Sequence, residues 1–357
     1  MLKGRGMSIW VLVVTLAIIV WYIFQSGPAP LQTPGHINVL EQVTLGGVRQ
    51  WISIRAADPH APVLLFLHGG PGSANLAKLR LQTPDLEQHF VVVAWDQPGA
   101  GKSASLGFNY NRLSIAQMVA DAHELVAYLK VRFGVEKIYL MGFSWGTVIG
   151  LSLAHLYPQD FLAFISVSQV VYPGEGERLS LEFVRQKAAQ AGDGRAITAL
   201  AGVDPSYQSK DWLRQVTIER NWLLHYGGVY HTTNSYSHEI WLLLKAHEYS
   251  LAEVGLWPGR SSASLKQMWS EVMQVNFFET LPQVDCPIYF FVGRFDYNAP
   301  AQLTAAYYQK LVAPAGKHLV WFENSAHDIF YDEPQQLVQE VLAILKEVSG
   351  GVYVVHE

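Results

Sequence analysis

Short apolar runs alternate with segments of helical periodicity along most of the chain. Apolar runs of strand length lie at residues 51–56, 63–67, 91–95, 137–141, 161–167, 287–292 and 318–322. The spacing of apolar residues predicts a helix between Ser114 and Gly134, with a capping box formed by Ser114 and Gln117. A second helix is predicted directly after Ser144 and before Pro158. This alternation predicts an α/β fold, a mostly parallel sheet with helices on both faces.

The alternation of strands and helices stops between residues 171 and 278. This stretch has helical patterns in place of strand-length apolar runs, and it contains five of the eleven tryptophans of the chain. We therefore expect a core made of two segments, residues 37–170 and 279–357, with a helical, aromatic-rich region between them.

The N-terminal residues combine two basic side chains with an uncharged apolar run. Lys3 and Arg5 lie within residues 1–7, and the 17 residues at 8–24 carry no charge, which is close to the shortest length that spans a bilayer. We expect a cytoplasmic N-terminus, a membrane anchor at 8–24 and a linker at 25–36, which places the rest of the chain outside the cytoplasm. The alternative is a signal peptide whose cleavage releases a secreted protein.

Composition excludes several classes of protein. Half of the 357 residues are apolar and 15% are charged, which is typical of a folded chain with a large core. The net charge of −5 offers no basic field, so nucleic acid is not expected as a partner. The single cysteine, Cys286, rules out an internal disulfide.

The segment WDQPGAGKS, residues 95–103, ends like a phosphate-binding loop. Gly101, Lys102 and Ser103 match the end of the motif G-x-x-x-x-G-K-[ST], but Asp96 stands where the motif has its first glycine. The residues that follow are too rich in Gly and Asn to open a helix at Lys102. We therefore expect no nucleotide at this loop.

A nucleophile motif lies between a predicted strand and a predicted helix. Residues 142–146 read GFSWG, which matches the pattern G-x-S-x-G with Ser144 at its centre. A sharp turn from strand to helix leaves no space for side chains at Gly142 and Gly146. Ser144 is therefore the predicted nucleophile, at a helix N-terminus that favours developing negative charge.

A glycine-rich loop follows the apolar run at 63–67. It reads HGGPG, and its glycines allow backbone N–H groups to turn toward a reacting oxygen. We expect the N–H groups of Gly70 and Trp145 to form an oxyanion hole.

The partners of the serine are expected at the ends of the last two apolar runs. A serine nucleophile needs a histidine to accept its proton and an acid to orient that histidine. Asp296 and His327 each follow an apolar run, at the end of the sheet where open α/β sheets place their sites. Asp285 lies just before one run and His318 begins the other, both at the opposite end of the sheet. Asp328 adjoins His327, so its side chain is expected to point elsewhere.

Together, the motifs HGGPG, WDQPGAGKS, GFSWGT, GRFDYNAP and NSAHD resemble the α/β-hydrolase superfamily, and most closely its proline iminopeptidase branch. The resemblance covers about residues 40–350 and implies an α/β-hydrolase fold in which residues 171–278 form an inserted helical cap. It also implies that the WDQPGAGKS loop lies close to the active site. The family usually has arginine at the position of Pro98.

An aminopeptidase must bind the free α-ammonium of its substrate, and the resemblance implies that a cap glutamate does so. We expect Glu219 and Glu248 to be the substrate-binding acids, with Trp222 beside Glu219 in a neighbourhood suited to a proline ring. The glutamates considered are Glu175, Glu177, Glu182, Glu219, Glu239, Glu248 and Glu253. The cap histidines form no H-E-x-x-H pattern, so neither a metal nor another cofactor is expected.

Three functions are compatible with these residues. The leading prediction is a membrane-anchored serine aminopeptidase of the proline iminopeptidase type, which acts on a small molecule or short peptide through an acyl-enzyme. The second is an esterase, lipase-like enzyme or lactone hydrolase with the same triad. The third is a non-catalytic binding module, which the presence of Ser144, Asp296 and His327 argues against.

Overall fold

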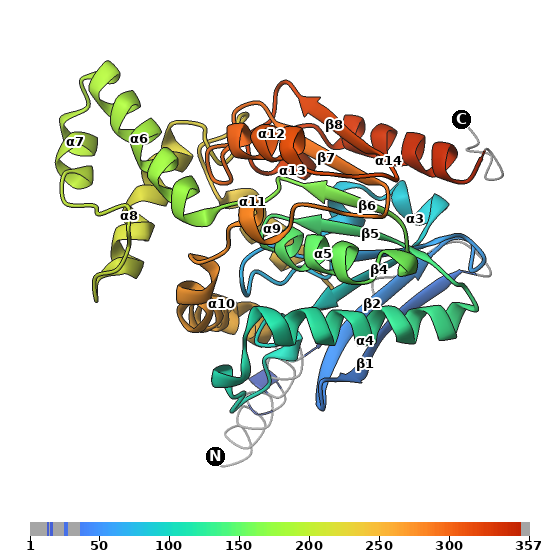
Figure 1. Cartoon of the computed structure of the whole chain (residues 1–357). Helices are drawn as coiled ribbons and strands as arrows, with labels where there is room; N and C mark the ends of the chain where they lie inside the picture. The colour runs from blue at the N-terminus through green and yellow to red at the C-terminus, as the bar shows by residue number, and fades with distance from the viewer. Residues whose placement is uncertain (1–12, 14, 17–24, 28–35, 351–357) are drawn as a thin grey trace, which may run out of the picture.

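The fold is built on a central sheet, seen in a computed structural model that describes residues 13, 15–16, 25–27 and 36–350 (Figure 1). Its eight strands have the order β1-β2-β4-β3-β5-β6-β7-β8. β2 is antiparallel to β1 and β4, and the other neighbouring strands are parallel. The strands are β1 (Ile37–Leu45), β2 (Val48–Ala56), β3 (Val63–Leu67), β4 (Val91–Asp96), β5 (Ile138–Phe143), β6 (Phe161–Val167), β7 (Ile288–Gly293) and β8 (Lys317–Phe322).

Helices cover both faces of this sheet because alternate strand residues point to opposite sides. In β3, Leu65 and Leu67 enter one hydrophobic core, whereas Leu64 and Phe66 enter the other. The first core is closed by α4 (Ile115–Phe133), α5 (Trp145–Leu156) and α12 (Ala301–Lys310). The second core is closed by α2 (Lys78–Gln82), α3 (Leu86–His89), α13 (Ile329–Asp332) and α14 (Pro334–Val348). The predicted fold class is thus confirmed.

A helical region, here called the insertion (residues 173–280), connects β6 to β7. Figure 1 shows α6, α7 and α8 beyond one end of the sheet. Trp212 stacks on Trp269 at 4.5 Å between ring centres, within a cluster of buried apolar residues that belongs to the insertion itself. The helices are α6 (Pro173–Ala191), α7 (Gly194–Leu200), α8 (Trp212–His225), α9 (Ser237–Lys245), α10 (Leu251–Val272) and α11 (Phe277–Thr280). Single 3-10 turns occur elsewhere, at η1 (Gly101–Ser103), η2 (Tyr110–Arg112) and η3 (Pro158–Asp160).

Two details of the sequence prediction differ from the structure. The sequence analysis missed β1, because this edge strand is mostly half-buried and its sequence, INVLEQVTL, mixes polar with apolar residues. The N-cap of α4 is present, since the Ser114 side chain accepts the Gln117 N–H at 3.1 Å. The second bond of the predicted capping box, from the Ser114 N–H to the Gln117 side chain, is not formed, and the Gln117 side chain donates to Asp121 at 2.6 Å.

The predicted membrane localisation is corrected. Most of the anchor predicted at 8–24, and all of residues 1–7, lie outside the described residues, and the predicted linker is described only at 25–27 and 36. In the part of the chain that the structure describes, no helix combines the length and the apolar character needed to cross a bilayer. Even the 22-residue helix α10 carries charged residues such as Glu253 and Arg260.

Candidate active site

Ser144 lies in a strained turn between β5 and α5. Its φ and ψ angles are 52° and −120°, a conformation that residues other than glycine rarely adopt. The turn requires glycine at two positions. A Cβ on Gly146 would lie 2.1 Å from the carbonyl oxygen of Leu67, and a Cβ on Gly142 would lie 2.7 Å from that of Gly146. The strained turn presents the Ser144 hydroxyl at the N-terminus of α5.

A chain of two hydrogen bonds joins Ser144, His327 and Asp296. The Nε2 atom of His327 is 2.8 Å from the Ser144 Oγ, and its Nδ1 atom is 2.9 Å from the Asp296 Oδ2. The other Asp296 oxygen accepts the backbone N–H groups of Asn298 and Ala299 at 2.9 and 2.8 Å. A carboxylate partner places the ring proton on Nδ1, so Nε2 is free to accept the serine proton.

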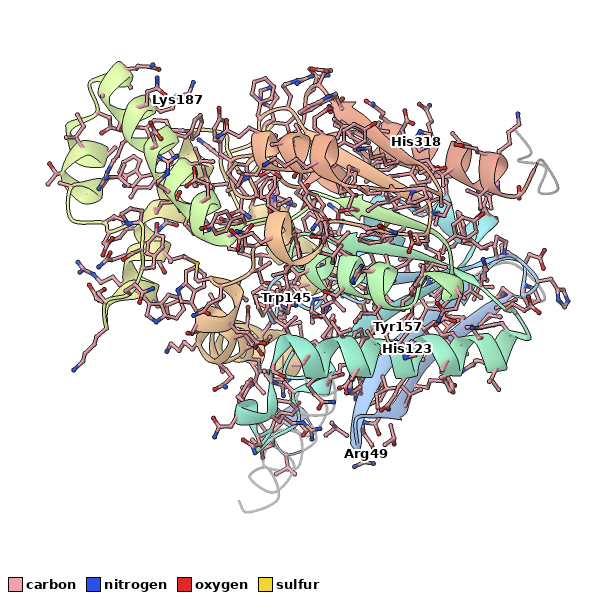
Figure 2. The ribbon with its side chains drawn as sticks, viewed as in Figure 1. Arg49, His123, Trp145, Tyr157, Lys187 and His318 are labelled. Carbon is pink, nitrogen blue, oxygen red and sulfur yellow. The ribbon has the colours of Figure 1, made fainter. Side chains whose placement is uncertain are left out.

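The three residues meet because each follows a parallel strand, at the carboxyl end of the sheet. Ser144 follows β5, Asp296 follows β7 and His327 follows β8. The His327 backbone is also fixed, since its N–H donates to the Val229 carbonyl at 2.9 Å and its carbonyl accepts from the Ser168 hydroxyl at 2.7 Å. His318, the rejected alternative, lies on β8 away from the insertion (Figure 2).

Gly70 and Trp145 border the same cavity as Ser144. Trp145 is the first residue of α5, so its N–H has no acceptor within the helix. It lies at the end of α5 that faces the insertion (Figure 2). Gly70 has a φ of 129°, and a Cβ there would lie 2.4 Å from the Gly72 nitrogen, which makes glycine necessary.

Gln97 connects the glycine-rich loop to the turn that holds Ser144, a contact that the sequence analysis missed. Its side chain donates to the His68 carbonyl at 3.0 Å and accepts the Trp145 indole N–H at 2.9 Å. Its backbone N–H donates to the His68 Nε2 at 3.2 Å. Burial lowers the pKa of His68 to about 4, so the ring stays neutral and can accept this bond. The position of Gln97, immediately after β4, was the available sequence signal.

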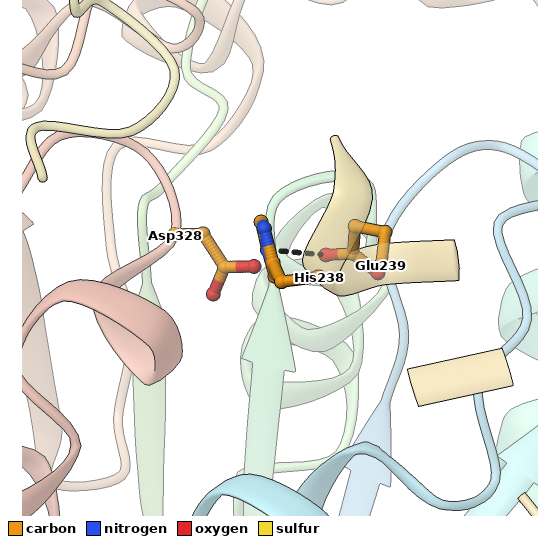
Figure 3. Close-up of side chains that lie close together, drawn as sticks. All are labelled: His238, Glu239 and Asp328. Carbon is orange, nitrogen blue, oxygen red and sulfur yellow. Dashed lines mark ion pairs between the residues drawn. The ribbon is translucent and has the colours of Figure 1, made fainter. Parts of the chain in front are cut away.

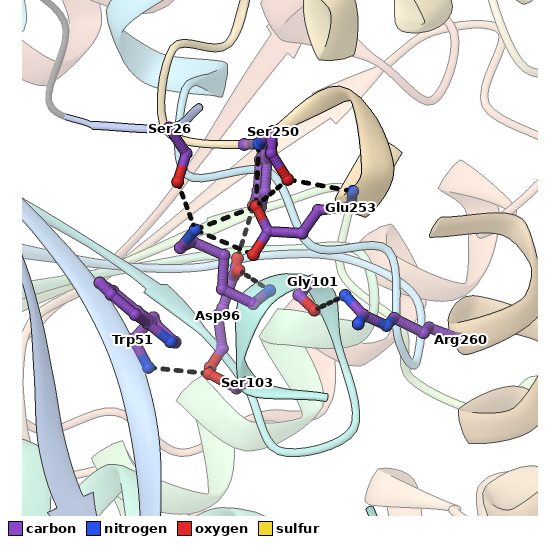
Figure 4. Close-up of polar contacts among 10 residues, drawn as sticks. Ser26, Trp51, Asp96, Gly101, Ser103, Ser250, Glu253 and Arg260 are labelled. Atoms are coloured by element: carbon purple, nitrogen blue, oxygen red, sulfur yellow. Dashed lines mark hydrogen bonds and ion pairs between the residues drawn. The ribbon is translucent and has the colours of Figure 1, made fainter. Parts of the chain in front are cut away.

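Charged and polar side chains of the protein itself hold the loop that resembles a phosphate-binding motif (Figure 4). The Lys102 ammonium lies 2.9 Å from a Glu253 oxygen and donates to the Ser26 hydroxyl at 3.0 Å. Asp96 accepts the Lys102 N–H at 2.7 Å and the Tyr249 hydroxyl at 2.7 Å. Burial raises the pKa of Asp96 to about 7 although both bonds oppose the shift. The loop therefore joins the sheet to the insertion.

Two cavities border Ser144, and both also touch Gly70. The first cavity, here called the first arm, has a volume of about 240 Å³ and is mostly apolar. Its lining includes Val216, Leu265, Trp269, Glu177 and Arg220. The second cavity, here called the second arm, has a volume of about 590 Å³. Its lining includes Asn75, Lys78, Glu239, Trp257, His327 and Asp328.

The substrate-binding residues predicted from sequence line neither arm. Glu219 is fully buried, accepts the Ser180 hydroxyl at 2.5 Å and pairs with Arg220. Glu248 is also fully buried, and both of its oxygens accept from Arg80, at 3.0 and 2.9 Å. Trp222 packs against the insertion core.

Glu177 does reach the first arm. One of its oxygens pairs with Arg220, whereas its buried Oε2 atom has no hydrogen-bond partner. Burial raises the pKa of Glu177, although Arg220 acts in the opposite direction. The sequence analysis considered this residue but did not select it, because helical periodicity alone does not show which acid faces a cavity.

The second arm contains a charged cluster (Figure 3). Ligand atoms of His238, Glu239 and Asp328 lie within 4.8 Å of one another, a spacing that could suit a metal ion. The Lys78 ammonium already lies among them, 2.7 Å from the Asp328 Oδ2 and 3.7 Å from the Glu239 Oε1. The Lys78 ammonium neutralises one of the two carboxyl groups and already contacts two of their oxygens, so the donor set lacks the charge and the free ligands that a divalent metal ion needs.

Sequence comparison gives a long match and a shorter one. A family model described as alpha/beta hydrolase fold matches residues 62–334. The chain is 30% identical over 301 residues to a probable aminopeptidase, YbaC, of Bacillus subtilis (strain 168), which covers 84% of this chain and 93% of that protein. It is 32% identical to a proline iminopeptidase of Xylella fastidiosa over 107 residues, 30% of this chain and 32% of the relative.

Solved structures with the same fold include two proteins of low sequence identity. A proline iminopeptidase-related protein from Thermus thermophilus has a TM-score of 0.64 at 20% identity, covering 88% of this chain and all of the other. A proline iminopeptidase from Mycobacterium smegmatis has the same TM-score at 17% identity, with the same coverage. At these identities the likeness concerns the fold alone.

Proposed function

Because the chain belongs to the α/β-hydrolase family, as its motifs predicted, we propose that it is a serine hydrolase in which Ser144 is the nucleophile. The observation that carries this proposal is the pair of hydrogen bonds, 2.8 and 2.9 Å long, that connects Ser144 to His327 and His327 to Asp296. An acid, a histidine and a serine in this order allow the hydroxyl to attack while its proton moves to the histidine.

The reaction proceeds in two halves. The Ser144 oxygen attacks the substrate carbonyl carbon as its proton passes to the His327 Nε2. The negative oxygen that forms is stabilised by the N–H groups of Gly70 and Trp145. His327 then gives the proton to the leaving group, and an acyl-enzyme remains. In the second half, a water molecule gives a proton to His327 and attacks the acyl carbon. The bond from that carbon to the Ser144 oxygen then breaks, Ser144 takes the proton back from His327, and the acid is released.

The substrate is an aminoacyl compound with a free α-ammonium, and the enzyme is an aminopeptidase of the proline iminopeptidase type. The long similarity to a probable aminopeptidase supports this choice. So does the first arm, where the unpartnered Glu177 oxygen can accept an ammonium beside an apolar surface suited to a proline ring.

The second candidate is an esterase or lactone hydrolase that uses the same three residues. The first arm favours it in one respect, since most of its lining is apolar and would accept a neutral acyl chain.

The two functions separate in a side-by-side assay of a prolyl arylamide, its N-acetyl analogue and a short p-nitrophenyl ester. The aminopeptidase function predicts that kcat/KM is higher for the free prolyl compound than for its acetylated analogue. Cleavage of the ester alone would assign the esterase function. A fluorophosphonate tests the shared step, since it should label Ser144 in both cases, and absence of labelling would overturn the serine mechanism.

A further inference from the structure

The charged cluster of the second arm contains more negative than positive groups. Lys78 provides one positive charge, whereas Glu239 and Asp328 provide two carboxyl groups. Burial would raise the pKa of Glu239, but Lys78, His238 and Asp328 together outweigh burial and lower it to about 2, so Glu239 is ionised. Burial raises the pKa of Asp328, and a cation that arrives beside this carboxyl group favours its ionised form.

Two buried acceptor atoms in this arm have no partner. The Oδ1 atom of Asp328 and the Oδ1 atom of Asn75 are both buried without a hydrogen bond, and their residues are only 2% and 7% exposed. Both residues line the second arm. A buried acceptor without a donor is costly, and a ligand that brings N–H groups removes that cost.

Other groups around the cluster also suit a cation. Glu239 keeps 31% of its side chain exposed, so it can be reached from the cavity. The Tyr230 hydroxyl donates to Glu239 at 3.2 Å, and the aromatic side chains of Tyr230, Tyr236 and Trp257 line the arm. His238 faces the same carboxylate, with its Nε2 atom 3.6 Å from the Glu239 oxygen.

The position of His327 determines which part of the substrate enters this arm. His327 must give its proton to the leaving group, so the leaving group has to lie next to it. His327 lines the second arm but not the first. The acyl part therefore occupies the first arm, and the leaving group occupies the second.

We propose that the second arm selects leaving groups that carry a positive charge, such as a peptide whose second residue is lysine or arginine, or the amide of a diamine. The cation is held by Glu239, Asp328 and the side-chain amide oxygen of Asn75. This inference rests on the proposed acyl transfer by Ser144, and it names the substrate class of the same site.

The first test does not require peptidase activity. Lysinamide and norleucinamide share the α-ammonium and differ in the cationic group at the end of the side chain. Each is added while a fluorophosphonate labels the protein. Lysinamide should slow labelling at a concentration about tenfold or more lower than norleucinamide does, the factor expected for one charge-assisted hydrogen bond. Equal protection by the two amides would overturn the proposal.

The second test compares hydrolysis of prolyl-lysinamide and prolyl-norleucinamide. The ratio of their kcat/KM values should favour the lysine compound and should fall about tenfold in Glu239→Gln. Glu182→Gln is the matched control, because Glu182 is an exposed acid of the insertion outside both arms, and it should keep the ratio. Asn75→Asp adds a carboxylate to the arm and should raise the ratio, which keeps the test decisive if Glu239→Gln does not fold.

The outcomes separate this inference from the proposed function. If neither peptide is cleaved while labelling proceeds, the aminopeptidase function fails, and the protection assay still decides whether the second arm binds cations. If both peptides are cleaved at equal rates, the proposed function stands and the inference fails. A lysine preference that disappears with a metal chelator would assign the cluster to a metal ion and also overturn the inference.

Discussion

The polar residues that follow the strands and the acidic residues of the insertion owe their positions to different parts of the fold. Ser144, Asp296 and His327 are each fixed by the backbone turn that follows a strand, so their positions depend on the sheet. Glu177 and Glu219 lie in the insertion, where helix packing decides their surroundings, and only Glu177 reaches a cavity beside Ser144. The comparison teaches that the reacting groups are specified locally, whereas substrate contacts depend on how the helices pack.

The largest effect is expected for Ser144→Ala. This variant removes the proposed nucleophile, so kcat/KM should fall about 10⁴-fold or more for every substrate, by analogy with other serine triads. Thermal unfolding should change little, because the substitution removes one oxygen atom. Parallel kinetics on an arylamide and an ester check the prediction. A variant that loses one activity and keeps the other would contradict this comparison, since the residues that follow the strands are expected to act on every substrate.

A smaller and selective effect is expected for Glu177→Gln. If Glu177 binds the α-ammonium, KM for the prolyl arylamide should rise about ten- to a hundredfold, and KM for a neutral ester should stay close to that of the parent. Steady-state kinetics on both substrates provide the measurement. Glu219→Gln is the matched control, since this acid is buried beside Arg220 but lines neither arm. A selective KM effect in Glu219→Gln instead would return the binding role to the residue predicted from sequence.

The smallest effect concerns Asp96, which joins the sheet to the insertion through the Tyr249 hydroxyl. Burial raises its pKa to about 7, so the folded protein holds a proton that the unfolded chain releases at lower pH. Its contribution to stability is therefore complete below about pH 4 and is lost as pH rises toward about 7. Asp96→Asn should reduce the fall in unfolding free energy over this range, measured by urea denaturation at several pH values. An unchanged pH dependence would show that Asp96 is ionised in the folded protein.

Much of the sheet, and the residues at the carboxyl end of its strands, could be predicted because their sequence signals are local. The bounds predicted for β3 and β6 are those of the structure, and the sequence placed Ser144, Asp296 and His327 after strands that do end on the same side of the sheet. Steric need explains why GFSWG was informative, since Gly146 has no space for a side chain. The catalytic roles of these residues stay predictions, for which the assays above are the tests.

The charged lining of the two arms could not be predicted in the same way. Glu248 is buried against Arg80, which lies 168 positions earlier in the sequence, and Glu219 is buried against Ser180 of another helix. Asp328 was rejected as the acid of the triad because it adjoins His327. Its side chain does point elsewhere, toward Lys78, a residue 250 positions away in sequence. Contacts over such distances have no signature in the periodicity of a single chain.

The position of Ser144 between two separate arms has a consequence for the order of events in catalysis. In the mechanism proposed above, the first product leaves the second arm while the acyl group is still bonded to Ser144 in the first. The molecule that next enters the vacated arm then determines the outcome. Water would yield a free acid, whereas an amine that fits the arm would yield a new amide bond. An enzyme that works in this way would therefore also join peptides when a suitable amine occupies the second arm ahead of water.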